Sequence, residues 1–154
     1  MRKRWLGVST AVALALILAL PSAAFAPGRP LFAAMSGQNE IGEDGEPGAG
    51  DRDGAGSFSA VIRGRQLCYG IAVRNIEDPI AAHIHRGGPN VNGPIRVTLT
   101  PPESGDPGAL SDCVRVRLRL LRSFRRNPAR WYVNVHTPDF EAGAVRGQLF
   151  SRGA

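Results

Sequence analysis

Aromatic residues and lysine are scarce in this sequence. Phenylalanine, tryptophan and tyrosine together make up 6% of the 154 residues, and Lys3 is the sole lysine. A nucleic-acid-binding domain is usually strongly basic and carries aromatic side chains on which bases stack. The formal net charge is +6, and it falls to +3 when Arg2, Lys3 and Arg4 at the N-terminus are set aside. This composition argues against nucleic acid as a partner.

The sequence also lacks the short motifs of the common enzyme classes. It contains neither the Gly-x-Ser-x-Gly turn of serine hydrolases nor a glycine-rich phosphate loop followed by lysine. Many of its acidic residues lie in residues 38–56, where nothing fixes the separation that paired carboxylates need for glycoside hydrolysis. We therefore expect a binding or structural protein rather than an enzyme of these classes.

The first residues have the layout of a secretory signal peptide. Three basic residues precede an apolar run over residues 6–20, which is shorter than the about 20 residues that a membrane-spanning helix needs. Pro21 and small residues follow, so we expect a signal peptide over residues 1–24, cleaved after Ala24 or, alternatively, after Ala26. The mature protein would then be secreted or extracytoplasmic and have no stable membrane span, whereas an uncleaved segment would act as an anchor.

Two cysteines, Cys68 and Cys113, follow the signal-like segment, and both lie in strand-like contexts. In an oxidising compartment an even number of cysteines favours a disulfide. A bridge between these two would close a loop of about 46 residues, which the chain-entropy relation values at roughly 4 kcal/mol. Two buried free thiols are the alternative. We predict the disulfide, because that contribution is a large share of a small domain's stability.

Alternation of hydrophobic and polar residues predicts a mainly β fold. The segments that read as strands are residues 31–35, 58–62, 67–73, 80–85, 94–99, 131–137 and 143–150. Residues 112–126 fit a short strand through Val116 followed by a helix over about Arg117–Arg126. Asn127 and Pro128 would end that helix. Antiparallel strands with one short helix indicate a β-sandwich or a partly open barrel.

The chain length suits one domain, which we expect over residues 31–150. Residues 38–56 are rich in glycine and acidic residues and show no hydrophobic periodicity beyond Ile41. Such a composition buries little apolar surface. We therefore expect this segment to form a flexible acidic loop within the domain.

The three histidines of the sequence all lie in strand-like segments. His83 and His85 are two residues apart, so their side chains leave the same face of one strand. His136 ends another strand and shares a face with Tyr132 and Asn134. If the two strands are neighbours in the sheet, the three imidazoles converge. Three histidines with an open coordination position are common at catalytic zinc, and imidazole also suits copper.

A metal is one of two explanations for these histidines. Imidazoles on a sheet can instead form hydrogen bonds with Asn134, Tyr132 or loop carbonyl groups. They would then hold the loop of residues 87–93 in place without any ion. The sequence leaves both explanations open.

Seven arginines lie between residues 115 and 130, in the end of the predicted short strand, the predicted helix and the segment after it. Its members are Arg115, Arg117, Arg119, Arg122, Arg125, Arg126 and Arg130. Divided between a strand and a helix, they would form a basic surface able to meet anionic polymers or lipid headgroups. A solvated face with no partner is the ordinary alternative.

Several short motifs occur in an order that resembles the CHRD domain, the chordin-type family. They are Ser36–Glu40, Leu67–Tyr69, Ala81–Gly87, Asn92–Pro94, Asn127–Pro128, Tyr132–Thr137 and Gly143–Leu149. The chain departs from the family pattern at Ile41 and Gly42, which replace a proline pair, and in its arginine-studded helix. The resemblance implies a mainly β, antiparallel immunoglobulin-like β-sandwich or barrel that is exported, and it transfers no catalytic residues.

Together these observations predict an exported, non-enzymatic CHRD module that binds a partner or serves structurally at the cell exterior. Its sharpest extension is one zinc or copper ion held by His83, His85 and His136. One alternative is a small mononuclear metalloenzyme, redox or hydrolytic, that uses the same residues. Another is an envelope-associated protein whose arginine face binds an anionic polymer. The expected partners are thus an anionic envelope polymer or another exported protein.

Overall fold

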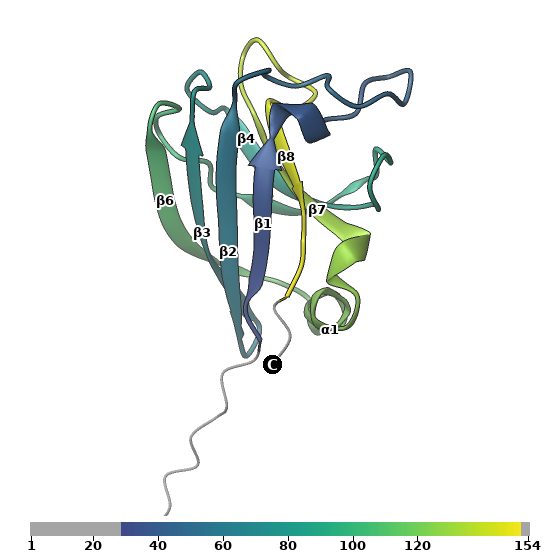
Figure 1. Ribbon diagram of the computed structural model, residues 1–154. Coiled ribbons are helices and arrows are strands. Elements are labelled where there is room, and N and C mark those ends of the chain that lie inside the picture. Colours follow the sequence, from purple (N-terminus) through teal and green to yellow (C-terminus); the bar gives the residue numbers. More distant parts are fainter. Residues whose placement is uncertain (1–28, 152–154) are drawn as a thin grey trace, which may run out of the picture.

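Eight strands form one antiparallel sheet within residues 29–151, the part of the chain that the computed structural model describes. The strands are β1 (Leu31–Ser36), β2 (Ala55–Arg63), β3 (Gln66–Arg74), β4 (Ala81–Arg86), β5 (Ile95–Leu99), β6 (Gly108–Arg115), β7 (Trp131–His136) and β8 (Val145–Gln148). Their order in the sheet is β5-β4-β7-β8-β1-β2-β3-β6. The sheet curls into a nearly closed barrel (Figure 1), which confirms the predicted mainly β fold.

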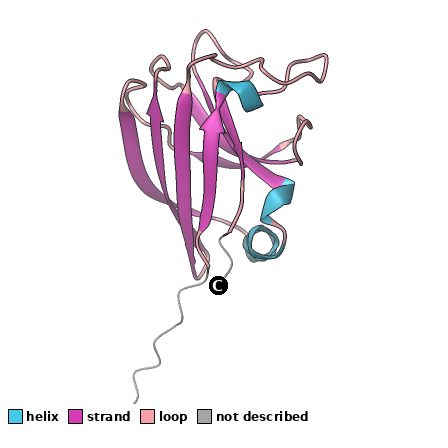
Figure 2. Ribbon diagram, in the orientation of Figure 1, coloured by secondary structure: helices cyan, strands magenta, loops and turns pink. Residues whose placement is uncertain are grey.

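One α-helix and two short 3-10 turns complete the structure (Figure 2). The helix α1 (Leu118–Arg126) follows β6. The turn η1 (Gly37–Asn39) lies at the start of the acidic loop, and the turn η2 (Pro128–Arg130) precedes β7. Leu121 and Phe124 bury one side of α1, and the Phe124 and Trp131 rings form a T-shaped pair with centroids 4.8 Å apart. The predicted helix is confirmed. No helix within residues 29–151 has the length and apolarity needed to span a membrane.

The inward faces of the strands form the apolar core, as the alternation predicted. In β3, Leu67, Tyr69, Ile71 and Val73 are buried and alternate with residues of the outer face. β6 begins at Gly108, earlier than the sequence indicated. The reason is that Gly108 and the residues after it pair with residues 66–73 of β3, so partners distant in sequence extend the strand.

The predicted disulfide is confirmed. Cys68 of β3 and Cys113 of β6 are direct partners in the antiparallel register, with their Cα atoms 4.0 Å apart. The bridge therefore fixes β6 to its one neighbour in the sheet. The predicted signal peptide lies outside the described residues.

The acidic loop packs against the barrel at several points. Asp51 donates a backbone hydrogen bond to the Ala144 carbonyl, while Gly48 and Ala49 donate to the Glu40 carbonyl within the loop itself. Glu40 and Ile41 are buried. The flexibility of this loop stays a prediction, but its contacts bring one carboxylate into the barrel wall.

The two ends of the described chain lie together at one end of the barrel. Phe32 and Phe150 exchange backbone hydrogen bonds of 2.8 Å, and their ring centroids are 5.8 Å apart. In Figure 1 this end is at the bottom, whereas the loop between β7 and β8 lies at the top.

Candidate metal centre

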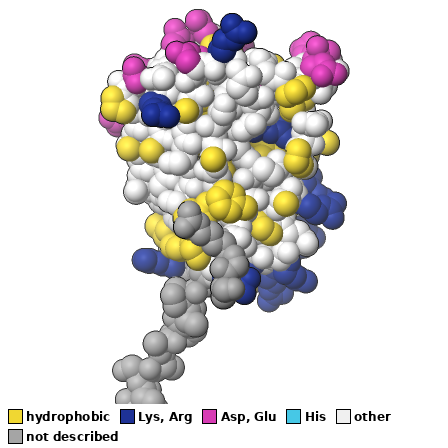
Figure 3. Space-filling model, in the orientation of Figure 1, with side chains coloured by type: hydrophobic (Ala, Val, Ile, Leu, Met, Phe, Trp, Pro, Cys, Tyr) yellow, Lys and Arg dark blue, Asp and Glu magenta, His cyan; other side chains and the backbone are white. Residues whose placement is uncertain are grey.

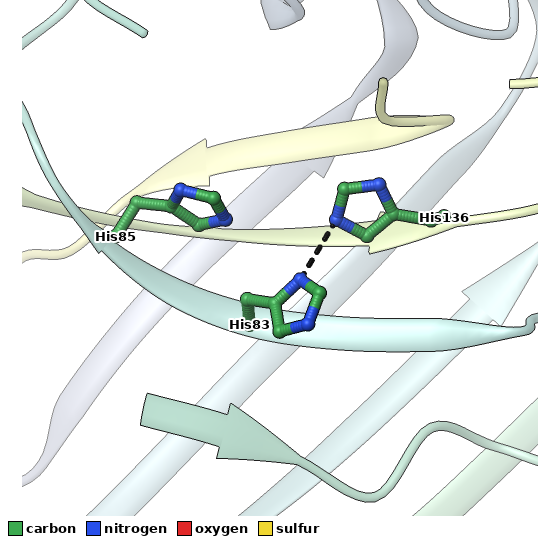
Figure 4. A group of neighbouring side chains, drawn as sticks. All are labelled: His83, His85 and His136. Carbon is green, nitrogen blue, oxygen red and sulfur yellow. Dashed lines mark hydrogen bonds between the residues drawn. The ribbon is translucent and has the colours of Figure 1, made fainter. Parts of the chain in front are cut away.

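The antiparallel pairing of β4 with β7 brings the histidines together. Ala81 lies opposite His136, His83 opposite Asn134 and His85 opposite Tyr132. Alternation along β4 puts both of its histidines on the face to which His136 also projects. Figure 4 shows the three rings turned toward one another above the two strands.

The ring nitrogens are close enough to share a ligand. His83 Nδ1 lies 3.0 Å from His136 Nε2, and one ring nitrogen from each histidine lies within 4.8 Å of the other two. Ring centroids of His85 and His136, the most widely spaced pair, are 6.4 Å apart. The structure thus brings together the three residues that the sequence singled out. Metal binding by them stays a prediction.

Backbone carbonyl groups fix the orientation of two of the rings. His85 Nδ1 lies 2.8 Å from the Gly93 carbonyl oxygen, and His136 Nδ1 lies 2.8 Å from that of Glu141. A carbonyl oxygen only accepts, so each Nδ1 must donate its proton, which makes each Nε2 an acceptor. The Nε2 of His136 accepts from His83 Nδ1, whereas that of His85 has no partner within residues 29–151. This arrangement of a backbone acceptor behind the ring is typical of histidines that bind metals.

His85 Nε2 is buried and has no hydrogen-bond partner within residues 29–151. A buried polar atom without a partner costs about 1–3 kcal/mol, so native structures seldom keep one without a reason. A cation bonded to this lone pair would remove the deficit.

Burial lowers the pKa of all three imidazoles. The effect is largest at His83, where burial and the two neighbouring histidines lower the pKa to about 4. The pKa values of His85 and His136 are also lowered, mainly by burial. The rings are therefore neutral at pH 7, which is the protonation state that binds a metal.

The cluster is enclosed on one side and open on the other. His85 and His136 are each 8% exposed, whereas His83 is half-buried. Solvent can therefore reach the cluster beside His83. A metal held by three imidazoles at this position would keep a coordination site for water or another ligand.

Tyr132 and Asn134 lie against the histidines, as their shared face with His136 predicted. The Tyr132 ring stacks on His85 with centroids 4.7 Å apart, and its hydroxyl accepts a hydrogen bond from the Gly93 amide at 3.2 Å. The Asn134 amide lies beside His85 on one side and Glu40 on the other and influences the pKa of both, but it forms no hydrogen bond with His85 Nε2 or Glu40 Oε1. Both residues therefore support His85, one by stacking and the other by polar contact.

The sequence reasoning missed Glu40 as a member of this region. Its side chain is 3% exposed and Oε1 has no hydrogen-bond partner within the described chain. Burial raises the pKa of the Glu40 carboxyl to about 7, against the lowering effects of Arg146 and Asn134. Gly143 has a φ of +147°, and a Cβ there would collide with this carboxylate, so glycine leaves the space that Glu40 occupies.

Arg146 of β8 was also missed, although it is 2% exposed. Its guanidinium lies 3.5 Å from the centroid of the Tyr132 ring and donates to the carbonyl oxygens of Gly88 and Val91, each at 3.0 Å. It also donates to Asn92 Oδ1 at 3.1 Å. The one sequence signal for Glu40 and Arg146 was that both fall within motifs of the family resemblance.

These contacts also support part of the explanation without a metal. His85 and Arg146 hold the loop of residues 87–93 through carbonyl groups, and Gln148 Nε2 donates to the Gly87 carbonyl at 2.7 Å. On the histidine side, however, the bond to this loop is formed by His85 Nδ1, and the other bonds come from Arg146 and Gln148. None of them satisfies His85 Nε2, which points into the cluster.

The arginines predicted as a basic face are all exposed. They lie at the end of β6, along α1 and in η2, and Arg125 donates to the Ile62 carbonyl at 3.3 Å. Figure 3 shows basic side chains gathered in the lower right of the view, where α1 lies, and acidic side chains near the top. The basic face and the acidic loop thus occupy different ends of the molecule.

Comparison with known proteins gives one match. The family described as the CHRD domain matches residues 31–149, which is most of the chain. No curated protein and no solved structure matches the sequence significantly.

Proposed function

The chain belongs to the CHRD domain family, and we propose that it is an exported, non-enzymatic module that binds one zinc or copper ion. The proposed ligands are His83, His85 and His136. The observation that carries this proposal is His85 Nε2, a buried lone pair that faces the other two imidazoles and has no partner in the described chain.

The donor set supports the proposal because it fits both ions. Three neutral imidazoles are a usual ligand set for zinc and also suit copper. With bonds of about 2.1 Å, tetrahedral ligands lie about 3.4 Å apart. The His83 and His136 nitrogens are joined by a hydrogen bond of 3.0 Å, and all three donors lie within 4.8 Å. An ion bound there would replace this hydrogen bond, with the His83 proton moving to its Nε2. Small rotations of the side chains would close the remaining difference.

Export is supported by the disulfide and by the family. Disulfides persist in oxidising compartments and are rare in the cytosol, and Cys68 is bonded to Cys113. The expected signal peptide over residues 1–24 would deliver the chain to such a compartment. There, zinc or copper would meet the folded module without competition from reduced cytosolic thiols.

The test is the metal content of the mature protein after dialysis. We expect about one equivalent of zinc or copper by elemental analysis, and one binding site per chain when the stripped protein is titrated with either ion. His136→Ala should lower the affinity by more than about 100-fold, beyond the effect of losing an outer contact. Circular dichroism should show that this variant is folded.

A matched control neutralises exposed acidic residues that could bind metal weakly. Glu43→Gln, Asp44→Asn and Glu46→Gln combined should leave the stoichiometry and the affinity unchanged. A stoichiometry that survives His136→Ala, or one that the acidic-loop variant abolishes, would disprove the proposed site.

A mononuclear metalloenzyme is the second candidate, favoured by the half-buried His83 beside the solvent. An open coordination position there could bind and activate water or a redox substrate. The test compares stripped protein, metal-loaded protein and metal-treated His136→Ala in ester hydrolysis and superoxide consumption. Turnover that needs both the metal and His136 would support catalysis, and its absence in the loaded protein would favour the binding module.

A further inference from the structure

The barrel has a seam between its two edge strands, β5 and β6. Within residues 29–151, β5 pairs only with β4, and β6 pairs only with β3, so each has one edge without a strand partner. A groove of about 490 Å³ runs between these edges and the start of α1. An exposed strand edge offers backbone N–H and C=O groups to an added strand.

Four arginines line this groove. They are Arg96 of β5, Arg115 at the end of β6, and Arg117 and Arg119 at the start of the helical segment. All four side chains are exposed, and none has a hydrogen bond or ion pair within the described part of the chain. No acidic residue lines the groove. The groove therefore carries four positive charges without a counterion from the protein.

The floor of the groove is aliphatic. Val97 and Val116 are buried and Leu120 is half-buried, and the groove has no aromatic residue among its lining. Bases of single-stranded nucleic acid would have no ring on which to stack. The floor can instead make apolar contact with small aliphatic side chains of a bound peptide. An acidic polysaccharide has no such side chains.

A second groove, also lined by arginines, adjoins the first. It has a volume of about 420 Å³ and shares Arg96 with the first. Arg86 and Arg130 also line it, and both are exposed. Arginines from β4, β5, β6 and η2 thus line two adjoining grooves at the seam.

We propose that this seam binds an extended acidic segment of a partner protein, added as a strand along the free edge of β5. In such a strand, alternate side chains are about 6.7 Å apart on one face. Arg115 and Arg117 have the same two-residue spacing and would meet alternate carboxylates, with Arg96 across the groove. Small apolar residues between them would face Val97 and Val116. Backbone pairing would supply affinity, and the arginines would select the charge.

The probe is a labelled synthetic peptide of alternating glutamate and valine, titrated into the mature protein at low salt. We expect saturable binding that weakens as salt is added. Arg96→Glu, Arg115→Glu and Arg117→Glu should each weaken it by about tenfold or more, in line with the loss of a charge-assisted contact. Arg52→Glu and Arg74→Glu, which reverse exposed charges outside both grooves, should leave binding within about twofold.

Two further probes test the mode of binding. The same peptide N-methylated at alternate residues keeps its charge but cannot pair with a strand edge, so its binding should be lost. Polygalacturonate, a carboxylated polysaccharide, should bind more weakly than the peptide at equal charge. The proposal is overturned if the unmodified peptide does not bind, if N-methylation has no effect, or if the polysaccharide binds as well. Binding to protein stripped of metal should be unchanged, which separates this site from the histidines.

Discussion

The two halves of the sheet bury different kinds of side chain. In the half formed by β1, β2, β3 and β6, the buried residues are apolar, and a disulfide joins the last two strands. In the half formed by β4, β7 and β8, polar side chains are buried on the strands or packed against them. The buried polar and charged residues of the described chain are Glu40, His85, Asn134, His136, Thr137 and Arg146. One half therefore contributes mainly stability, while the other holds the candidate site.

β7 shows how this difference arises. All six of its residues are buried, including the polar ones that face away from the core. The outward face is covered by loops: Gly93 contacts Tyr132, the Glu40 side chain approaches Asn134, and the Glu141 carbonyl accepts from His136. A strand covered on both faces can keep imidazoles partly dry, which an open sheet face cannot.

The largest expected effect separates the two halves. Replacing both cysteines, Cys68→Ala with Cys113→Ala, should lower the free energy of unfolding by about 4 kcal/mol, because the unfolded chain regains the freedom of the closed loop. Denaturant unfolding measures this. Under conditions where the variant is folded, metal affinity should stay within about threefold of the wild type. A larger loss would mean that the histidines depend on the disulfide-linked half.

Arg146→Met tests the polar half. The variant loses the hydrogen bonds to the loop of residues 87–93 and leaves Glu40 without the nearby cation. Breaking a buried charged pair costs 3–5 kcal/mol, and we expect about 3 because Glu40 can take up a proton. The loss should be greater at pH 8 than at pH 5. A loss below about 1 kcal/mol at pH 8 would show that Arg146 does not compensate the carboxylate.

Glu40→Gln should change how stability depends on pH. The pKa of Glu40 is about 7 in the folded protein, against 4.5 for an unperturbed glutamate, which stands for the unfolded chain. As pH rises, the unfolded chain therefore releases this proton before the folded protein does. The wild type should therefore lose roughly 2–3 kcal/mol relative to the variant between pH 4.5 and pH 8. Unfolding curves over this range measure the difference. A difference that is constant with pH would contradict the raised pKa.

The histidines change the pH dependence of stability in the opposite direction, but they do not affect the comparison of wild type with Glu40→Gln. Their pKa values are lowered in the fold, so the unfolded state binds protons first as pH falls below 6.5. Their contribution to stability is lost as pH falls from 6.5 toward 4. Because wild type and Glu40→Gln share all three, the difference between the two isolates the carboxyl.

Tyr132→Phe should have the smallest effect. The phenyl ring can still stack on His85 and under Arg146, but the Gly93 amide loses its acceptor. We expect a loss of about 1 kcal/mol in the free energy of unfolding and a change below tenfold in metal affinity. A loss of metal binding in this variant would instead assign the tyrosine hydroxyl a direct part in the site.

Local patterns in the sequence predicted most of the fold. Alternation identified the inward face of β3, and the two-residue spacing of His83 and His85 put both on one face of β4. The convergence of His136 with these two histidines could be predicted only on the condition that β4 pairs with β7. The local sequence does not determine that pairing, because the register between distant strands depends on contacts elsewhere in the fold. The early start of β6 was missed for the same reason.

The buried charges could not be found from local patterns. Glu40 lies in a glycine-rich acidic stretch that resembles a solvated loop, and only its packing against Gly143 and β7 takes it out of water. Arg96 stands alone on its strand, so the arginine run at residues 115–130 did not include it. The order of the strands brings it to the same groove.

Phe32 and Phe150 are adjacent, which affects how the domain can be joined to another protein or to a surface. A chain that enters and leaves a fold at neighbouring points can be spliced into a host polypeptide, or tethered by either end, without pulling the barrel apart. His136 precedes the loop at the opposite pole. An immobilised or fused copy would therefore have the loop that follows His136 on the side away from its attachment.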